Sequence, residues 1–332
     1  MPDTPATCWI ITDGAAGNER QALALAERLH VASRVWRLAP GAPWSWFAPR
    51  IVAGARLALP AGVREQFSAP WPTLAIGCGR AAALYTRGLR GWSGGRTYTV
   101  QILDPRVAPK HWDLVIAPRH DGLAGANVLN PLGSLNPVDD AWLADGAAAF
   151  AELARLPSPR TAVLIGANHR DVAVDTGYCV GLVEALARAH EKNGGSFLVS
   201  TSRRTPALLR DFLRSAFARF PGTFWSGPQD GANPYAGYLA HAQRIVVTPD
   251  SVNMLSEACA VGVPVRLWLP QPARGKLGRL HRALIESGHV RAFGGARVPQ
   301  PAPLRETAPI AAEVERCWRA ARDRLRSPAS SE

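Results

Sequence analysis

Asp250 and Ser251 stand between a short apolar strand, Ile245–Val247, and a predicted helix that ends at Gly262. Both residue types are frequent helix N-caps. The N-terminus of a helix presents backbone N–H groups and a partial positive charge, so it can hold a diphosphate without help from a lysine. This strand, turn and helix therefore predict a site for a phosphorylated ligand.

Asn253 and Glu257 are four residues apart in the same predicted helix, so they share one of its faces. A carboxylate one turn inside the helix can accept hydrogen bonds from two hydroxyl groups of a sugar. The pattern favours a nucleotide whose phosphates lie on the turn and whose ribose is bound by Glu257. The alternative is a capped helix with a surface glutamate, which occurs in α/β proteins of any function.

Two adjacent arginines follow another predicted strand, Ser196–Ser200, and stand among hydroxyl groups. Such a pair can clamp a phosphate, although a solvated loop has the same composition. We also include the glycine that ends strand Thr161–Ile165 and a serine of the predicted helix. The predicted donor site comprises Gly166, Ser202, Arg203, Arg204, Asp250, Ser251, Val252, Asn253, Met254, Ser256 and Glu257.

Asp13 and His120 are the candidate general bases, because each follows a predicted strand at the end where α/β sheets carry their ligands. The turn around Asp13 bears glycines but is not a G-x-G-x-x-G dinucleotide fingerprint. A capping or turn aspartate and a hydrogen-bonded His–Asp turn are the structural alternatives. Residues expected to bind the acceptor are Gly14, Asp121 and Asn127.

The length of 332 residues exceeds what one core comfortably supports, so two domains are expected. Hydrophobic residues make up 47% and charged residues 19%, which is typical of a globular protein. No apolar run reaches the roughly 18 residues of a spanning helix, and no secretory signal is recognisable. The five cysteines are scattered, which favours neither zinc nor disulfides. We expect a cytoplasmic protein.

The net charge of +12 favours anionic partners. No long Lys/Arg block or nucleic-acid module is present, so we expect no nucleic-acid binding. Residues 41–60, in which prolines restrict helix to about Arg50–Leu59, combine aromatic and cationic side chains: Trp44, Trp46, Phe47, Arg50 and Arg56. Such a segment can rest on an anionic membrane, or it can pack its apolar face into the domain.

Strands alternate with helices in both halves of the chain, which predicts an α/β protein with two Rossmann-like domains. Leu156–Arg160 holds two prolines between an Ala-rich predicted helix and a new strand, so it is the expected boundary. We predict an N-terminal domain of residues 1–157 and a second domain of residues 158–300. Residues 301–332 are expected to form a linker and a final helix that packs back on the first domain.

Four motifs in this order resemble one family, whose plant members are mitochondrial fission factors of the elongated-mitochondria type and whose bacterial members are described as glycosyltransferases. The resemblance covers roughly residues 7–325, and its motifs are T-D-G-A-A-G-N-E-R-Q-A-L, P-R-H-D-G-L-A-G-A-N-V, T-S-R-R-T-P and T-P-D-S-V-N-M-L-S-E-A-C-A-V-G-V-P-V. That family resembles the GT-B glycosyltransferases, in which two Rossmann-like domains face each other across a cleft. The resemblance implies an acceptor in the N-terminal domain.

The last motif is similar to the donor-site helix of the lipid II N-acetylglucosaminyl transferase. By that likeness, the backbone around Val252–Met254 would hold the diphosphate and Glu257 the ribose. The first loop lacks that transferase's glycine-and-histidine pattern, so its catalytic base does not carry over.

We therefore expect a metal-independent glycosyltransferase that has no resident cofactor. It would move a sugar from a nucleotide diphosphate to a lipid-linked or saccharide acceptor at the inner face of the membrane of the cell envelope. No D-x-D motif stands at a strand end, and the helix dipole together with arginines would stabilise the leaving diphosphate. The alternatives are a non-catalytic adaptor that recruits a partner to a membrane and a sugar-nucleotide epimerase.

Overall fold

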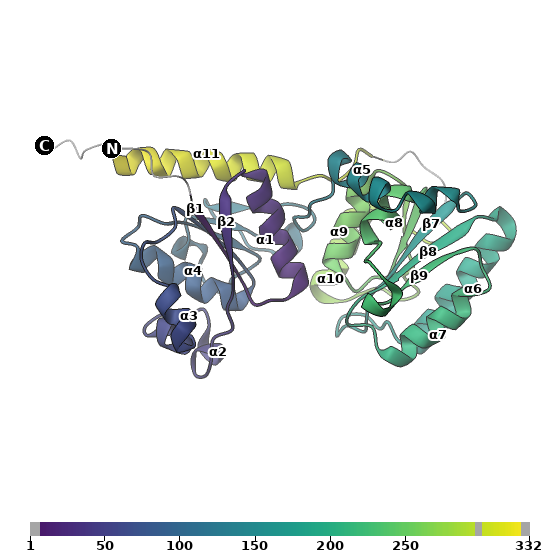
Figure 1. Ribbon diagram of the computed structural model, residues 1–332, viewed down its shortest axis with the longest axis horizontal. Coiled ribbons are helices and arrows are strands. Elements are labelled where there is room, and N and C mark those ends of the chain that lie inside the picture. Colours follow the sequence, from purple (N-terminus) through teal and green to yellow (C-terminus); the bar gives the residue numbers. More distant parts are fainter. Residues whose placement is uncertain (1–6, 296–300, 327–332) are drawn as a thin grey trace, which may run out of the picture. The chain divides into compact units, whose positions relative to one another are not determined.

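The computed structural model describes residues 7–295 and 301–326. The chain forms two compact units, each built around a six-stranded parallel sheet (Figure 1). The first unit runs to Pro137 and also includes the segment that begins at Glu306, whereas the second runs from Val138 to Arg305. The prediction of an α/β protein with two Rossmann-like domains is confirmed.

The first unit has the strand order β2-β1-β3-β4-β5-β6. Its core packs Ile10, Ile76 and Val100 of the sheet against α1 on one side, while Trp9 and Phe67 belong to a second cluster on the other. Its elements are β1 (Thr7–Thr12), α1 (Ala16–Arg28), β2 (Ala32–Arg37), α2 (Trp44–Phe47), a 3-10 turn (Ala55–Ala58), α3 (Ala61–Gln66), β3 (Leu74–Cys78), α4 (Arg80–Trp92), β4 (Tyr98–Ile102), β5 (Leu114–Ile116), β6 (Val128–Leu129) and α11 (Thr307–Arg326).

The second unit has the strand order β12-β11-β10-β7-β8-β9. The central strands are buried along nearly their whole length, as apolar parallel strands covered on both faces should be. Its elements are α5 (Asp140–Ala149), β7 (Arg160–Ile165), α6 (Thr176–Asn193), β8 (Ser196–Thr201), α7 (Ala207–Phe217), β9 (Gly222–Trp225), α8 (Tyr235–His241), β10 (Arg244–Val247), α9 (Val252–Val261), β11 (Val265–Leu267), α10 (Gly275–Glu286) and β12 (Val290–Ala292).

Each sheet has one point at which the strand order reverses. In the first unit β2 and β3 lie on opposite sides of β1, and in the second β8 and β10 lie on opposite sides of β7. Crossovers leave such a pair of strands in opposite directions, which opens a crevice beyond their carboxyl ends where α/β proteins bind ligands. The turns after β1 and β3, and those after β7 and β10, are therefore the expected positions of a ligand site.

The boundary between the units falls at Pro137, not at the predicted Pro157, because α5 packs against α8 of the second unit. Asp139 caps this helix by accepting a hydrogen bond from the backbone N of Trp142 at 2.7 Å. A Cβ atom on Gly146 would lie only 2.8 Å from backbone atoms of Ala236, so the two helices are in close contact. The proline-rich connection at 157 is thus a link inside the second unit.

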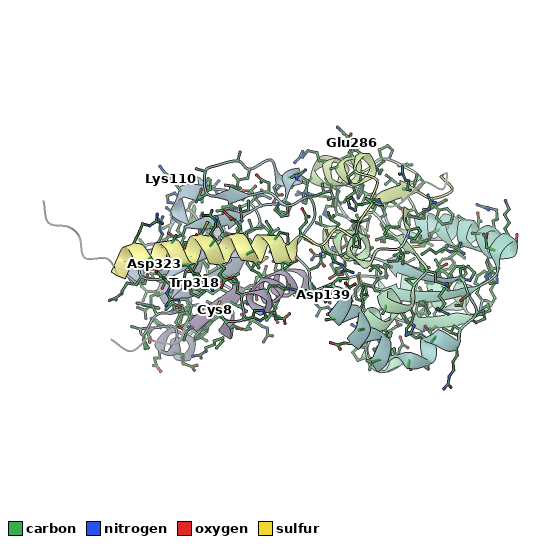
Figure 2. All side chains as sticks on the ribbon, turned by 90° about the horizontal axis from the view of Figure 1, so that it is seen from above. Cys8, Lys110, Asp139, Glu286, Trp318 and Asp323 are labelled. Carbon is green, nitrogen blue, oxygen red and sulfur yellow. The ribbon has the colours of Figure 1, made fainter. Side chains whose placement is uncertain are left out.

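Helix α11 belongs to the first unit, where it packs on α1 and β4. Trp318 of this helix and Cys8 of β1 are buried in the same cluster (Figure 2). Glu306, just before the helix, accepts hydrogen bonds from the backbone N of Leu132 at 2.7 Å and of Gly133 at 2.8 Å. The end of the chain is therefore fastened to the first unit by both apolar packing and backbone hydrogen bonds.

The expected helix over about Arg50–Leu59 was wrong: only the short 3-10 turn Ala55–Ala58 forms there. Among the described helices, none combines the length and apolar character that crossing a membrane requires.

The contact between α5 and α8 can be tested by Gly146→Ala. We expect it to lower the free energy of unfolding by about 1–3 kcal/mol, since the added methyl overpacks the contact, even though alanine is the better helix former by about 1 kcal/mol. Gly181→Ala is the matched control, because a Cβ there meets only Trp268 at an ordinary 3.6 Å. Urea unfolding of the full chain measures both. Equal stability of the two variants would refute the tight contact.

Candidate functional site

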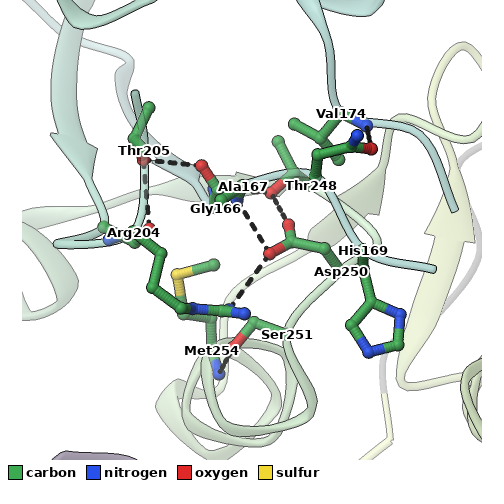
Figure 3. A network of polar contacts seen from close by, with 12 residues as sticks. Gly166, Ala167, His169, Val174, Arg204, Thr205, Thr248, Asp250, Ser251 and Met254 are labelled. Carbon is green, nitrogen blue, oxygen red and sulfur yellow. Dashed lines mark hydrogen bonds and ion pairs between the residues drawn. The ribbon is translucent and has the colours of Figure 1, made fainter. Parts of the chain in front are cut away.

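A buried carboxylate joins the two turns at the reversal point of the second sheet. Asp250 follows β10, and its Oδ1 accepts a hydrogen bond from the Thr248 hydroxyl at 2.6 Å. Its Oδ2 accepts one from the backbone N of Ala167, after β7, at 2.9 Å (Figure 3). The Thr248 hydroxyl in turn accepts from the backbone N of Gly166 at 2.8 Å. The carboxyl ends of β7 and β10 are therefore held together by side-chain bonds beyond the sheet itself.

Gly166 is a glycine for a steric reason. A Cβ atom at this position would lie 2.0 Å from Oδ2 of Asp250, closer than any real contact. The carbonyl oxygen of Gly166 accepts from the Thr205 hydroxyl at 2.6 Å, which ties the loop after β8 to the same point. The predicted donor-site glycine thus gives the carboxylate of Asp250 the space it occupies and anchors the loop after β8.

Arg204 is the cation of this network. Its Nη2 lies 3.4 Å from Oδ2 of Asp250, whose side chain is fully buried while that of Arg204 is 58% exposed. The backbone N of Arg204 donates to the Ser202 hydroxyl at 3.2 Å, so the loop holds its own shape. A buried carboxylate is costly unless it is paired. Arg204 provides that pairing and still has exposed guanidinium surface for an anion. The neighbouring Arg203 is exposed as well.

Helix α9 begins at this network. Ser251 is its N-cap, and its hydroxyl accepts from the backbone N of Met254 at 3.3 Å. Val252 and Asn253 precede Met254 in the same first turn, where N–H groups point along the helix axis toward its start. A ring nitrogen of His281 lies 2.8 Å from the carbonyl oxygen of Pro249, which positions the turn from the side of α10. The start of α9 is therefore a rigid, electropositive end.

Glu257 lies one turn further along α9 and is 2% exposed. Its Oε2 accepts a hydrogen bond from the Tyr235 hydroxyl of α8 at 2.6 Å. The alternative of a surface glutamate is therefore excluded. Ser256 is also buried, but its hydroxyl donates to the carbonyl oxygen of Val252 in its own helix at 2.8 Å.

Sequence reasoning missed Tyr235. It stands in the first turn of α8 after a loop rich in glycine and proline. No motif links it to Glu257, which is 22 residues further along the chain. Only the packing of α8 beside α9 brings the phenol to the carboxylate.

A cavity of about 710 Å³ opens beside the network, along the loops after β7 and β11. Asn168 and His169 line it next to Ala167, and Asp171 and Arg274 line it further on. Tyr178 of α6 also lines it and donates its hydroxyl to the carbonyl oxygen of Trp268 at 2.6 Å. Burial is the main cause that raises the pKa of Tyr178, and the nearby acidic groups of Cys179 and Asp250 add to the effect. Its phenol therefore stays neutral and polar in the cavity wall.

Asp13 occupies the reversal point of the first sheet. Its carboxylate accepts from the backbone N of Ala15 at 3.0 Å and from the side-chain N of Asn18 at 3.1 and 3.2 Å. Gly14 beside it has a φ of +81°, which a glycine adopts without strain. The carboxylate is thus both anchored and exposed, as a turn aspartate and a general base would each require.

His120 and Asp121 lie in a 3-10 turn, Arg119–Asp121, after β5. His120 is buried, and Oδ2 of Asp121 lies 3.4 Å from the backbone N of Asp104. Strands β3 and β4 separate β5 from β1, which corresponds to roughly 14 Å at the usual strand spacing. Asp13 and His120 therefore share the carboxyl edge of the sheet but do not form a pair, so only one of them can serve a given hydroxyl.

Asn127 lies away from these residues. It precedes β6, at the amino edge of the sheet, and its side-chain N donates to the carbonyl oxygens of Pro109 at 3.0 Å and Trp112 at 2.9 Å. Its amide closes a loop at the end of the sheet opposite to Asp13, so the expected place of Asn127 in an acceptor site beside Asp13 was wrong.

Across residues 7–295 and 301–326, no group of three or more His, Cys, Asp and Glu side chains has the arrangement of a metal site. The metal-independent mechanism rests on the donor chemistry described above and stays a prediction.

Comparison with known proteins identifies relatives that match most of the chain. The model of the family described as Mitochondrial fission ELM1 matches residues 16–318. The chain is similar to Mitochondrial fission protein ELM1 of Arabidopsis thaliana, with 28% identity over 282 residues. That match covers 76% of this chain and 65% of the plant protein, so the chain spans slightly less than two thirds of its relative's length.

Solved structures show the fold. UDP-GlcNAc 2-epimerase of Methanocaldococcus jannaschii, in complex with UDP-GlcNAc and UDP, superposes with a TM-score of 0.54 at 11% identity and covers 93% of this chain and 99% of that one. The glycosyltransferase SnogD from Streptomyces nogalater gives a TM-score of 0.51 at 14% identity, covering 97% and 99%. At such identities the likeness concerns the fold alone, and it confirms the GT-B type expected from the sequence.

The role of Asp250 can be tested by Asp250→Ala. The change leaves the Ala167 N–H, the Thr248 hydroxyl and Arg204 without their acceptor, so we expect a loss of about 3 kcal/mol or more in the free energy of unfolding. Asp211→Ala, at an exposed position on α7, is the control and should change it by less than about 0.5 kcal/mol. Thermal or urea unfolding measures both, and a variant as stable as wild type would show that the network is dispensable.

Proposed function

We propose that this chain, which belongs to the mitochondrial fission ELM1 family and has a GT-B fold, is a glycosyltransferase. Its second unit would bind a nucleotide-diphosphate sugar with the diphosphate at the start of α9 and the ribose on Glu257. The observation that carries the proposal is this buried carboxylate, one turn inside a helix whose electropositive end stands at the reversal point of the sheet. The structural neighbour in complex with UDP-GlcNAc and UDP supports the choice of ligand.

The diphosphate would lie against the first turn of α9. The Ser251 hydroxyl accepts a hydrogen bond from the backbone N of Met254. The phosphate oxygens would therefore meet the N–H groups of Val252 and Asn253, and the helix dipole would add attraction. Asp250 does not repel the ligand strongly, because Arg204 offsets its charge and its oxygens already accept from Thr248 and Ala167. The Arg204 side chain is partly exposed, so its guanidinium can also donate to the phosphate.

The ribose would be held by Glu257. A carboxylate has about four acceptor positions, and the Tyr235 hydroxyl occupies one of those on Oε2. The tyrosine thereby fixes the rotamer of the carboxylate before the ligand arrives, which reduces the entropy lost on binding. Burial of Glu257 also makes its hydrogen bonds to sugar hydroxyls stronger than they would be in water.

The sugar itself would enter the cavity of about 710 Å³. Its wall offers the side chains of Asn168, His169, Asp171, Gln271 and Arg274, a mixture of donors and acceptors that suits the hydroxyl groups of a hexose. The volume lies within the range of small-molecule sites.

Transfer needs a base and a stabilised leaving group. The base, Asp13 or His120, would take the proton of the acceptor hydroxyl, whose oxygen then forms a bond to the anomeric carbon. The bond from that carbon to the diphosphate breaks, and the nucleoside diphosphate leaves with the electron pair. The N–H groups at the start of α9 and Arg204 would bind the charge that develops on it.

The acceptor would be lipid-linked or a saccharide, presented at a membrane face. The first unit exposes large apolar side chains around α2 and the following turn: Trp46 is 69% exposed and Leu57 63%. Phe47 and Ile51 are exposed as well, and the nearby Arg50 is exposed and cationic. Aromatic, aliphatic and cationic groups on one short segment suit the interface of an anionic bilayer.

Donor binding is tested by calorimetry with UDP-, GDP-, ADP- and CMP-sugars. We expect one of these to bind, and Glu257→Gln to weaken it by tenfold or more, as for a lost hydrogen bond to a charged group. Tyr235→Phe should weaken it less. Glu184→Gln, on the exposed surface of α6, is the matched control and should bind as wild type does.

Wild type that binds none of these sugars, or Glu257→Gln that binds equally well, would contradict the proposal. Incubation with the bound sugar and no acceptor gives a further test, since a change in the sugar would identify an epimerase. Binding of a partner or of liposomes that survives Glu257→Ala, without donor binding in wild type, would identify an adaptor.

Membrane contact is tested by Leu57→Asp, which places a charge in the exposed apolar segment. We expect it to reduce sedimentation with vesicles that contain phosphatidylglycerol, because the apolar contact is lost and the added charge is repelled. Leu208→Asp is the matched control, since Leu208 on α7 is 85% exposed but belongs to the second unit. If both variants sedimented less with the vesicles to the same extent, or if neither did, this segment would not be the membrane contact.

A further inference from the structure

Two arginines of α4 hold the exposed apolar segment of the first unit in place. Nη2 of Arg80 donates to the carbonyl oxygen of Ser45 at 2.7 Å. Nη1 of Arg87 donates to the carbonyl oxygens of Pro49 at 2.7 Å and of Arg50 at 3.0 Å. Positions seven apart share one face of a helix, so both arginines point to the same side of α4. Helix α2 and the residues after it are therefore fastened along this face.

Further cations continue the same surface toward the end of α4. Arg90 stands three residues after Arg87, and its Nη1 donates to the carbonyl oxygen of Lys110 at 2.9 Å. Lys110 is exposed in the 3-10 turn Pro109–His111 (Figure 2). Partial burial, followed by the positive charges of these three side chains, lowers the pKa of His111 from its ordinary value. The cations of α4 and of the turn therefore lie close enough together to act on one imidazole.

The contacts of these side chains leave a cationic surface. The acceptors of Arg87 are neutral carbonyl groups, so its hydrogen bonds do not offset its charge. Nη2 of Arg90 lies 3.2 Å from Oδ1 of Asp113, but the Arg90 side chain is 42% exposed, and solvent weakens such a pair. Arg50 and Arg80 are exposed as well. We call these cations the α4 cationic face: Arg50, Arg80, Arg87, Arg90 and Lys110.

The α4 cationic face adjoins large apolar side chains of the same unit. Trp46, Phe47 and Ile51 are exposed within or next to the segment that the two arginines hold. The cations from Arg80 to Arg90 extend about 15 Å along α4 at the usual helical rise, so they are spread over a surface and not gathered around one point. An array of phosphates in a plane matches this spread better than a single small anion does.

We propose that the α4 cationic face binds the phosphate headgroups of an acidic phospholipid bilayer. The cations lie at the level of the headgroups, and Trp46 and Phe47 enter the boundary between headgroups and acyl chains. This inference rests on the membrane contact proposed above, and it names the lipid chemistry and the residues that recognise it. It requires no sugar donor, so it can be tested apart from sugar transfer.

The test is co-sedimentation of the full chain, without donor or acceptor, with vesicles of equal parts phosphatidylcholine and phosphatidylglycerol. Arg50→Gln combined with Lys110→Gln removes two exposed cations but keeps the backbone carbonyl groups to which Arg87 and Arg90 donate. We expect vesicle affinity to fall by roughly fivefold for each cation that is removed. Added NaCl should weaken the binding of wild type, and vesicles of phosphatidylcholine alone should bind it less tightly.

Arg188→Gln combined with Lys192→Gln is the matched control. It also removes one arginine and one lysine, both exposed, but from α6 of the second unit. Since the net charge of the two double variants is the same, the control should sediment as wild type does. Calorimetry with nucleotide sugars should give wild-type results for both. A wild type that binds vesicles in this way but binds no donor would contradict the glycosyltransferase and support the lipid surface.

Four results would overturn the proposal. The first is equal vesicle affinity for the double variant of the cationic face and wild type, and the second is an equal loss in the control, which would indicate general charge attraction. The third is binding of polyglutamate as tight as that of vesicles, which would identify an acidic protein as the partner. The fourth is inorganic phosphate that shifts the His111 Cε1–H resonance with saturation and releases the chain from vesicles, which would identify a small-anion site.

Discussion

The buried carboxylate of Asp250 is the interaction on which the second unit's site depends. It takes hydrogen bonds from a side chain of its own turn and from the backbone of the turn after β7, and it is paired with Arg204. Because its partners come from the turns after three strands, the start of α9 cannot shift without breaking several bonds. The surrounding residues follow from this constraint: position 166 must be a glycine, and the guanidinium must lie where a phosphate would meet it.

Much of this site could be predicted from local sequence. The strand, the capping Ser251, the helix and its end at Gly262 follow from short-range propensities, and the structure places each at its expected residues. The repetition of strand and helix also gave the correct architecture. The details that depend on distant contacts were beyond such reasoning. No spacing rule links Tyr235 to Glu257. The sequence near Asp139 likewise does not indicate that α5 packs on α8 rather than on the first unit.

The same distinction applies to residues whose surroundings depend on contacts that are distant in sequence. Ser256 has a polar side chain on the predicted donor-site helix, but it is buried and its hydroxyl donates to the carbonyl oxygen of Val252 in the same helix. Asn127 belongs to a suggestive motif, yet it stands at the amino edge of its sheet, where its amide closes a loop. Asp13 and His120 each follow a strand, and only the strand order shows that they are not neighbours.

The most direct test is a crystal structure of the full chain with the nucleoside diphosphate that it binds. The account predicts phosphate oxygens within hydrogen-bonding distance of the Val252 and Asn253 amides, and ribose hydroxyls on the Glu257 carboxylate, with Tyr235 still bound to it. A nucleotide bound elsewhere, or an α9 start closed by the protein's own side chains in that structure, would contradict it.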